Sequence, residues 1–281
     1  MTAVDLHVHS TASDGEATPA DVVRHAEALG LSAIALTDHD TLAGAAELAG
    51  SETALRVVPG CEFSVAAPWG EMHLLGYFLP VDDADLSAFL ADQRKRRETR
   101  GQEIVERLKR LGVSISYEDV QAVAQGSALG RPHVARALVA RRCVVDVGMA
   151  FDRYLGPGRA AFVPKVLPPV SDVIALVRQS GGVTAAAHLK DRGNADTLRM
   201  LAVAGMDAVE VLHPSHDART RKRILGAANA AGLLPTGGSD WHGDTPSRDV
   251  RGALGAMAVP ATWLAALEDL HASRVSARVA V

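Results

Sequence analysis

The sequence predicts an α/β protein in which βα units surround a parallel sheet or barrel, with a mainly helical subdomain inserted near the middle of the chain. Two observations carry this prediction. Short β-branched or apolar runs alternate with amphipathic stretches in about seven βα-like units. Between residues 113 and 168 the alternation stops, and helical patterns are separated by turns such as Gly130-Arg131-Pro132 and Pro168-Pro169.

The N-terminal units can be assigned from their capping and turn residues. Residues 4–8 form the expected first strand. Thr18-Pro19-Ala20-Asp21 predicts a helix start, because a threonine side chain caps the first turn and proline suits the first helical position; Gly30 predicts its end. The further expected elements are a strand at 33–37, a short helix at 42–49, a strand at 56–58 and two short strands flanking Trp69-Gly70.

The later part of the chain repeats this rhythm. We expect strands at 183–187, 208–212 and 233–236, and helices at 195–204 and 218–231. A long charged helix at 83–111 leads into the insertion. The predicted organisation is therefore a first barrel part (1–112), an inserted helical substrate-capping subdomain (113–168) and a second barrel part (169–281).

The composition indicates an ordinary globular protein. The chain has 281 residues, of which 48% are hydrophobic and 22% charged, and no run approaches the roughly 20 apolar residues that span a bilayer. No signal peptide precedes Asp5, and Cys61 and Cys143 are too few for a disulfide scaffold. We therefore expect a cytoplasmic protein without a membrane or an obligate protein partner. A formal charge of −4 disfavours a broad nucleic-acid-binding surface.

The histidines concentrate at the ends of the predicted strands. His7 and His9 alternate on one strand, so their side chains point to the same face. Similar positions hold Asp14, Asp38, His39, Glu62, His73, His188, His213, His216, Asp240 and His242. In barrels of βα units the carboxyl ends of the strands meet in one mouth, so these side chains should converge there. By contrast, His25 and His271 lie in helical stretches, where a hydrogen-bonded structural role is expected.

A cluster of nitrogen and carboxylate ligands without sulfur is typical of zinc, manganese or iron, and its carboxylates also suit magnesium. We expect two or three divalent ions, with manganese as the first candidate and zinc, iron or magnesium as alternatives. Ions at such a cluster would lower the pKa of a bound water and so provide a nucleophile.

Four motifs resemble those of the PHP (polymerase and histidinol phosphatase) family: Asp5-Leu6-His7-Val8-His9-Ser10, Thr37-Asp38-His39-Asp40, Pro59-Gly60-Cys61-Glu62 and Gly238-Ser239-Asp240-Trp241-His242. The resemblance implies a distorted (β/α)7 TIM-like barrel. It also implies a ligand set of His7, His9, Glu62 and Asp240 for one metal, a second set in which Glu62 bridges to His73 and His188, and a third set of Asp14, His39 and His242. Asp38 would orient a ligand.

The insertion is similar to that of the subgroup with nucleoside 3′,5′-bisphosphate phosphatases and a 5′-to-3′ exoribonuclease. The similarity rests on Gly130-Arg131-Pro132-His133, Tyr154-Leu155 and Phe162-Val163-Pro164-Lys165. Outside the insertion, Pro214-Ser215-His216 after Glu210-Val211 also fits that subgroup. The similarity makes Arg131, His133 and Lys165 candidates for holding a phosphate that is not cleaved. The alternative for Arg131 and Lys165 is a structural salt bridge. We interpret the basic run 94–110 as a solvated helix face with ion pairs.

The expected function is removal of the 3′-phosphate from nucleoside 3′,5′-bisphosphates by metal-activated hydroxide. His216 is the predicted general acid; His213 is the alternative and a candidate substrate-binding residue. Three other functions stay open: a 5′-to-3′ exoribonuclease on short RNA, a histidinol-phosphate-type phosphatase, and a non-catalytic metal-stabilised binding module. The expected partner is a small nucleotide or a short RNA.

Overall fold

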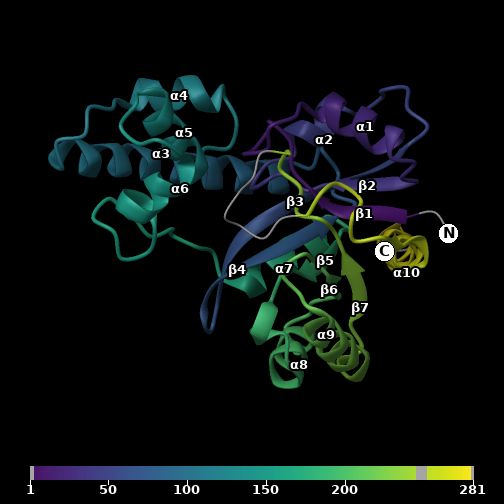
Figure 1. Ribbon diagram of the computed structural model, residues 1–281. Coiled ribbons are helices and arrows are strands. Elements are labelled where there is room, and N and C mark those ends of the chain that lie inside the picture. The colour runs from purple at the N-terminus through teal and green to yellow at the C-terminus, as the bar shows by residue number, and fades with distance from the viewer. Residues whose placement is uncertain (1–2, 245–251, 280–281) are drawn as a thin grey trace.

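The strands of the chain form one curved sheet that is nearly closed into a barrel. The computed structural model describes residues 3–244 and 252–279 (Figure 1). The sheet order is β7-β6-β5-β4-β3-β2-β1-β8. The strands are β1 (Ala3–Val8), β2 (Ala33–Leu36), β3 (Arg56–Ala67), β4 (Gly70–Tyr77), β5 (Val183–Ala186), β6 (Ala208–Leu212), β7 (Leu234–Gly237) and β8 (Val259–Pro260). The predicted α/β barrel class is confirmed.

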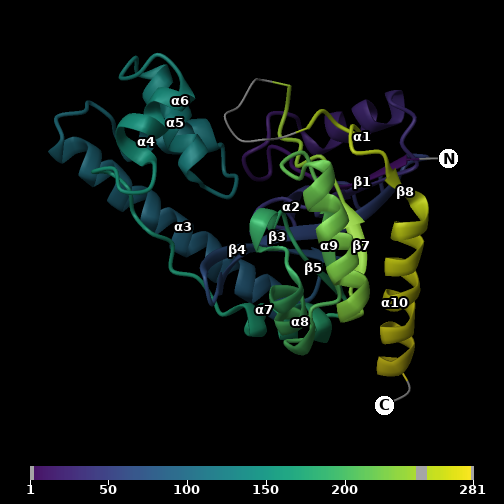
Figure 2. The same cartoon turned by 60° about the horizontal axis from the view of Figure 1, so that its bottom comes forward.

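Helices cover the outside of this sheet. They are α1 (Pro19–Ala28), α2 (Ala43–Glu47), α7 (Val170–Gln179), α8 (Ala195–Val203), α9 (Ala218–Ala231) and α10 (Ala261–Val279). Thr18 caps α1 as its sequence predicts, with the side chain accepting from the N–H of Asp21 at 3.2 Å. Figure 2 shows α10 on the outer surface, where it packs against β7. Within the described residues, no helix has the length and apolar character needed to cross a membrane.

The segment after β7 closes the barrel against β1. The N–H of His9 donates to the carbonyl of Trp241 at 2.9 Å, and Val8 and Trp241 form a parallel bridge. Gly238 allows this approach, because a Cβ there would lie 2.4 Å from the backbone nitrogen of His7. Closure brings the residues after β7 next to those at the end of β1, which is the condition for a shared site.

The strands on either side of Trp69-Gly70 are longer than we predicted. β3 and β4 form one long antiparallel hairpin, and β4 also runs antiparallel to β5. Glu62 and His73 therefore lie within these strands and not after them. Because β4 runs in the opposite direction, its amino-terminal half lies at the edge where the parallel strands end, and His73 still reaches the mouth.

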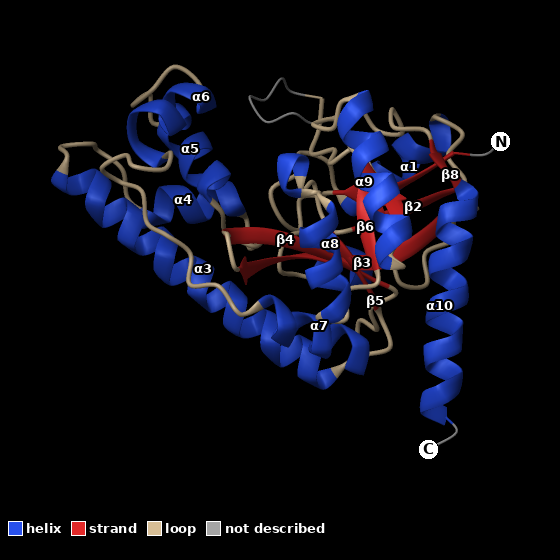
Figure 3. Cartoon of the chain, turned by 90° about the horizontal axis from the view of Figure 1, so that it is seen from below, coloured by secondary structure: helices blue, strands red, loops and turns tan. Residues whose placement is uncertain are grey.

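A long helix joins the barrel to the insertion. This helix, α3 (Ala84–Arg110), crosses the molecule from α7 to the insertion in Figure 3. The insertion contains α4 (Tyr117–Ala124), α5 (Arg131–Ala140), α6 (Val147–Ala150) and a π-helical turn, η1 (Phe151–Leu155). Leu86 and Leu90 of α3 pack in the barrel core, whereas Ile104 and Leu108 pack in the core of the insertion. The N-terminal part of α3 thus belongs to the barrel core and its C-terminal part to the core of the insertion. The limits of the inserted subdomain stay a prediction.

The insertion rests on loops at the mouth of the barrel. The N–H of Ala128 donates to the carbonyl of Ala12 at 3.0 Å, and the Arg136 guanidinium donates to the carbonyl of Asp14 at 3.3 Å. Arg97 of α3 forms a buried ion pair with Asp40, which follows β2. These contacts place the helical insertion over the ends of β1 and β2.

Candidate metal centre

The residues predicted as metal ligands converge at the barrel mouth. The first group is formed by His7, His9, Glu62 and Asp240, whose ligand atoms all lie within 4.8 Å of one another. The Nε2 atoms of His7 and His9 lie 3.3 and 3.2 Å from Glu62 Oε2. The same nitrogens lie 3.5 and 3.4 Å from Asp240 Oδ1. Two imidazoles and two carboxylates thus face a common point.

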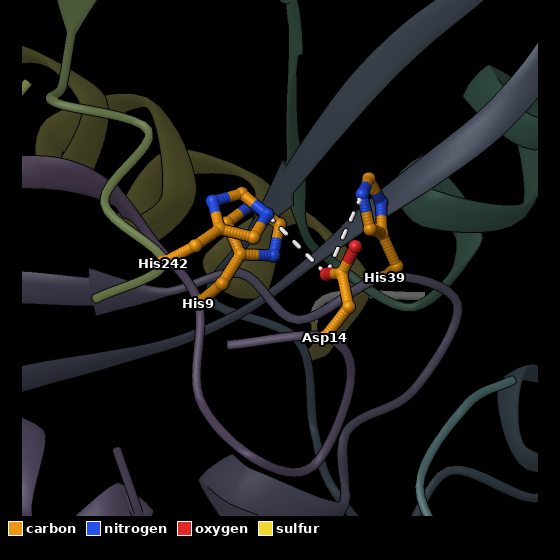
Figure 4. A group of neighbouring side chains, drawn as sticks. All are labelled: His9, Asp14, His39 and His242. Atoms are coloured by element: carbon orange, nitrogen blue, oxygen red, sulfur yellow. Dashed lines mark ion pairs between the residues drawn. The ribbon is translucent and has the colours of Figure 1, made fainter. Parts of the chain in front are cut away.

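A second group shares His9 and stands beside the first. In Figure 4, His9, Asp14, His39 and His242 point toward one another. Asp14 Oδ1 lies 3.3 Å from His242 Nε2 and 3.9 Å from His39 Nε2. The other ring nitrogen of His39 lies 3.1 Å from Glu62 Oε2. His39 therefore has one nitrogen toward each group.

The remaining predicted ligands meet the second oxygen of Glu62. His73 Nδ1 lies 2.7 Å and His188 Nε2 3.0 Å from Glu62 Oε1. Glu62 thus has one oxygen toward His7 and His9 and the other toward His73 and His188. This is the arrangement expected of a bridging carboxylate.

Buried atoms without hydrogen bonds show that this cluster fits cations. Within the part of the chain that the structure describes, these atoms include His7 Nε2, His9 Nε2, Asp14 Oδ1, His39 Nδ1 and His242 Nε2. Burying polar atoms without partners is costly, so their grouping around shared points is best explained by ions. The donors are nitrogen and oxygen without sulfur, which suits zinc, manganese, iron or magnesium.

The carboxylates of the cluster are held in their charged form. Burial would raise the pKa of Glu62, but the facing histidines, His73 first, lower it well below its usual range. The pKa of Asp14 is also low, because His242 and His39 outweigh the effect of burial. Ionised carboxylates are the form that binds a metal.

A glutamate that the sequence analysis did not select orients His7. Glu210 of β6 is fully buried, and its Oε1 accepts from His7 Nδ1 at 3.0 Å. This bond fixes the proton on Nδ1 and leaves Nε2 of His7 available to a metal. Oε2 of the same carboxylate accepts from the N–H of His188 at 2.8 Å. The signal in the sequence was an acidic residue inside the apolar strand AVEVL.

Asp38, which we predicted to orient a ligand, contacts the loop that follows His9. Its carboxylate accepts from the N–H and hydroxyl of Ser10 at 2.8 and 2.7 Å, and from the hydroxyl of Ser13 at 2.6 Å. These bonds fix the loop between His9 and Asp14. Asp38 does not line the cavity in front of the cluster.

The two histidines after β6 differ in what their rings offer. His216 is buried; its Nδ1 donates to the carbonyl of Val211 at 3.0 Å, and its Nε2 accepts from the N–H of Lys190 at 3.1 Å. With both nitrogens used in this way, the structure does not support the predicted general-acid role of His216. The Nδ1 of His213 accepts from the N–H of Ser215 at 3.1 Å, so its proton lies on Nε2, 3.6 Å from Asp240 Oδ2.

A cavity of about 460 Å³ opens in front of the cluster. One wall holds candidate ligands, among them Glu62, His188 and Asp240. The opposite wall is formed by α3 and the insertion, and it is basic: Arg97, Arg100, Arg131 and Lys165 line it. A ligand in this cavity would contact both the metal cluster and several cations.

Two of these cations correct our interpretation of the basic run. Its outer side forms the expected helix ion pairs, such as Arg96 with Asp92 and Arg107 with Glu103. Arg97 and Arg100, however, turn inward to the cavity. Arg100 donates to the carbonyl of Val163 at 2.8 Å.

The predicted phosphate-binding residues have different surroundings. Arg131 lines the cavity; its guanidinium lies over Phe151 and Phe162 and donates to the carbonyl of Leu155 at 3.3 Å. Lys165 also lines the cavity, but its ammonium donates to Glu71 and to Ser64. This is the structural salt bridge that we considered as the alternative for Lys165.

His133 has a structural environment that does not support a substrate-binding role. It lies outside the cavity lining, and its ring is buried. Its Nδ1 accepts from the N–H of Gly130 at 3.0 Å, and Nε2 contacts the hydroxyl of Ser127 at 3.1 Å. Burial, with a smaller contribution from Arg136, lowers the pKa of His133 to about 4, so the ring is neutral near pH 7.

Comparisons with known proteins find similar proteins along most of the chain. Residues 5–139 match the model of the PHP domain. The chain is 34% identical to a 5′-3′ exoribonuclease of Haemophilus influenzae, over 85% of this chain and 89% of that protein. It is 32% identical to a 3′,5′-nucleoside bisphosphate phosphatase of Chromobacterium violaceum, over 86% and 88% of the two chains. A crystal structure of a candidate metal-dependent phosphoesterase from Bifidobacterium adolescentis superposes with a TM-score of 0.86 at 31% identity, covering 96% of each chain.

Proposed function

Because this chain belongs to the PHP domain family of metal-dependent phosphoesterases, we propose that it removes the 3′-phosphate from nucleoside 3′,5′-bisphosphates. The observation that carries this proposal is the pairing of two walls in one cavity. The ligand cluster would hold the phosphate that is cleaved, and the basic wall would hold the other phosphate. A volume of about 460 Å³ suits a single nucleotide.

The charges on the basic wall support a bound anion. Asp40 neutralises Arg97 and Glu71 neutralises Lys165, whereas Arg100 donates to the backbone carbonyl of Val163. Burial, together with the like charges of Arg131 and Arg97, lowers the pKa of Arg100 to about 10, which leaves it charged near pH 7. Like charges crowded in this way are stabilised when a phosphate binds between them.

We propose two or three divalent ions at the cluster, with manganese first and zinc, iron or magnesium as alternatives. When bound, such ions supply Lewis-acid activation of a water and neutralise charge on the phosphoryl oxygens. The protein's part is to hold the ligands in place: Glu62 stands between the groups, and Glu210 fixes the tautomer of His7.

We propose that His213 gives a proton to the leaving 3′-oxygen. Its Nε2 carries the ring proton and lies beside Asp240, and both residues line the cavity, whereas the ring of His216 is occupied by backbone contacts. A positioned acid is useful here because a sugar alkoxide is a poor leaving group.

A second candidate is a 5′-to-3′ exoribonuclease on short RNA. The observation favouring it is the 34% identity to the H. influenzae protein, along nearly the whole chain. Both reactions break the ester bond between a 3′-oxygen and phosphorus while the 5′-phosphate of the same nucleotide is held. The two functions therefore differ only in what is attached beyond the cleaved phosphate.

The test is hydrolysis of adenosine 3′,5′-bisphosphate, a short 5′-phosphorylated RNA and histidinol phosphate by the same preparation. We expect 3′-phosphate release from the bisphosphate, loss of activity after chelation and better recovery with Mn²⁺ than with Ca²⁺, which prefers larger all-oxygen sites. Full activity in protein shown to be free of metal would contradict the metal assignment. Activity on histidinol phosphate alone would contradict the substrate assignment.

A further inference from the structure

One cation at the cavity differs from all those on the basic wall. Lys190 lines the cavity and its side chain is exposed. Among the described residues, its ammonium has neither an ion-pair nor a hydrogen-bond partner that would neutralise it. The cations on the opposite wall, in contrast, each hold a carboxylate or a carbonyl: Arg97, Arg100, Arg131 and Lys165.

The turn that carries Lys190 is strained and firmly held. His188 and Lys190 adopt positive φ values of 29° and 51°, which are unfavourable for residues other than glycine. Three side chains stabilise this backbone. Glu210 accepts from the N–H of His188, His216 accepts from the N–H of Lys190, and Arg223 donates to the carbonyl of Lys190 at 2.8 Å. His216 is therefore a positioning residue for this turn.

Lys190 reaches the cavity from a part of the mouth other than the loops on which the insertion rests. The insertion rests on the loops after β1 and β2 and, through Lys165, on Ser64 of the β3–β4 hairpin. Lys190 follows β5, and the nearby cavity residue Ser215 follows β6. These strands lie on the other side of β4 from β3 in the sheet order. Lys190 thus reaches the cavity from the barrel, whereas the basic wall reaches it from α3 and the insertion.

We propose that Lys190 binds the phosphate that follows the cleaved one in a short single-stranded RNA. This inference rests on the second candidate of the proposed function, the cleavage of short RNA. If the 5′-phosphate lies at the basic wall and the cleaved phosphate at the cluster, the next phosphate of a strand needs a further cation at the same cavity, and Lys190 supplies one. An unpaired ammonium is suited to a backbone phosphate there, because single strands are held largely by charge and without sequence preference. A nucleoside bisphosphate has no group for Lys190 to bind.

The first test is binding, which does not depend on hydrolysis. The probe is a 5′-phosphorylated RNA octamer whose first linkage carries a methylene in place of the scissile oxygen. Lys190→Gln should weaken binding about threefold to tenfold. It should also reduce the slope of log affinity against log salt concentration by about 0.7, the value for one lost phosphate contact on a single strand. The control is Lys222→Gln, an exposed lysine of α9 outside the cavity lining.

The second test compares two substrates. Lys190→Gln should raise KM for a 5′-phosphorylated trinucleotide about threefold to tenfold, and leave kcat/KM for adenosine 3′,5′-bisphosphate within about twofold. An unchanged salt slope, an equal change in Lys222→Gln, an equal loss on both substrates or failure of the wild type to bind the octamer would each overturn the inference. A Lys190-dependent salt slope in a protein that hydrolyses no nucleotide would support the RNA contact and refute the proposed function.

Discussion

The two walls of the cavity are built on different principles. On the barrel wall, ligand side chains are buried, and partners such as Glu210 fix which ring nitrogen is available. On the insertion wall, Arg100 and Arg131 are half-buried and are held by backbone carbonyls and aromatic rings. On the barrel wall, hydrogen bonds fix the orientation of the ligand side chains. On the insertion wall, the arginine side chains supply positive charge and are less tightly held.

This difference indicates a division of labour. A metal cluster needs its ligands fixed before the ions arrive, so its residues lie on strands and on loops tied to strands. A wall that recognises a second phosphate needs charge and shape, which helices of an insertion supply. Changes on the barrel wall should therefore affect every substrate, and changes on the insertion wall only those with a second phosphate.

The largest effect is expected at Glu62. Glu62→Gln keeps the side-chain volume and removes the bridging charge, so turnover should fall by about 10²- to 10³-fold or more on all substrates, together with metal content. Activity and bound metal are measured on the same sample. Glu268→Gln, at an exposed ion pair with Arg56, is the matched control and should change neither. Near-normal turnover with full metal content would remove Glu62 from the centre.

The next largest effect separates His213 from His216. His213→Gln should lower kcat for 3′-phosphate release by about 10²-fold, but change p-nitrophenyl phosphate hydrolysis by less than about threefold, because that leaving group needs no acid. His216→Gln should instead destabilise the fold by about 1–3 kcal/mol through its lost hydrogen bonds. Kinetics on both substrates and thermal unfolding distinguish them. A loss specific to the poor leaving group in the His216 variant would restore the role predicted from sequence.

A smaller effect is expected at Glu210, which contacts His7 through a hydrogen bond. Glu210→Gln should weaken metal binding by about 10- to 100-fold and be rescued by excess metal, because the ligands themselves remain. Metal titration followed by activity measures this. If saturating metal restores nothing, Glu210 acts directly on the reaction and not through His7.

The parts of the fold and site that could be predicted from sequence are those set by the periodicity of a single strand or helix. His7 and His9 share a strand face, and the bounds of α9, 218–231, follow from periodicity and agree with the structure. Glu62 and His73 were selected from sequence and meet in the structure, although the extent of the hairpin that carries them was not predicted. We inferred strand ends at these two residues from the sequence around them. The antiparallel direction of β4 depends on which strands it pairs with in the folded chain, so the sequence did not reveal it.

The rest depended on contacts that only the folded chain provides. Whether a histidine is a ligand, an acid or a structural ring depends on which atoms meet its two nitrogens, as the Gly130 N–H bond to His133 and the Lys190 N–H bond to His216 show. Likewise, the charge pattern of α3 does not reveal that Arg97 and Arg100 face inward, because they alternate with residues that pair on its outer surface.

The division of labour is tested most directly by Arg131→Ala on two substrates. The change removes a guanidinium contact to phosphate worth roughly 1.5–3 kcal/mol, so kcat/KM for adenosine 3′,5′-bisphosphate should fall roughly ten- to a hundredfold. Lys165→Ala should behave similarly but more weakly, because an ammonium lacks the fork of a guanidinium. The control is Arg153→Ala, an exposed arginine outside the cavity lining, which should change neither substrate.

The second substrate, p-nitrophenyl phosphate, has no second phosphate, so its kcat/KM in the Arg131 variant should stay within about twofold of wild type at equal metal content. That selective loss is the result our account predicts. An equal loss on the two substrates would mean that Arg131 acts on the cleaved phosphate or on folding, and would contradict the assignment of chemistry to the barrel and specificity to the insertion.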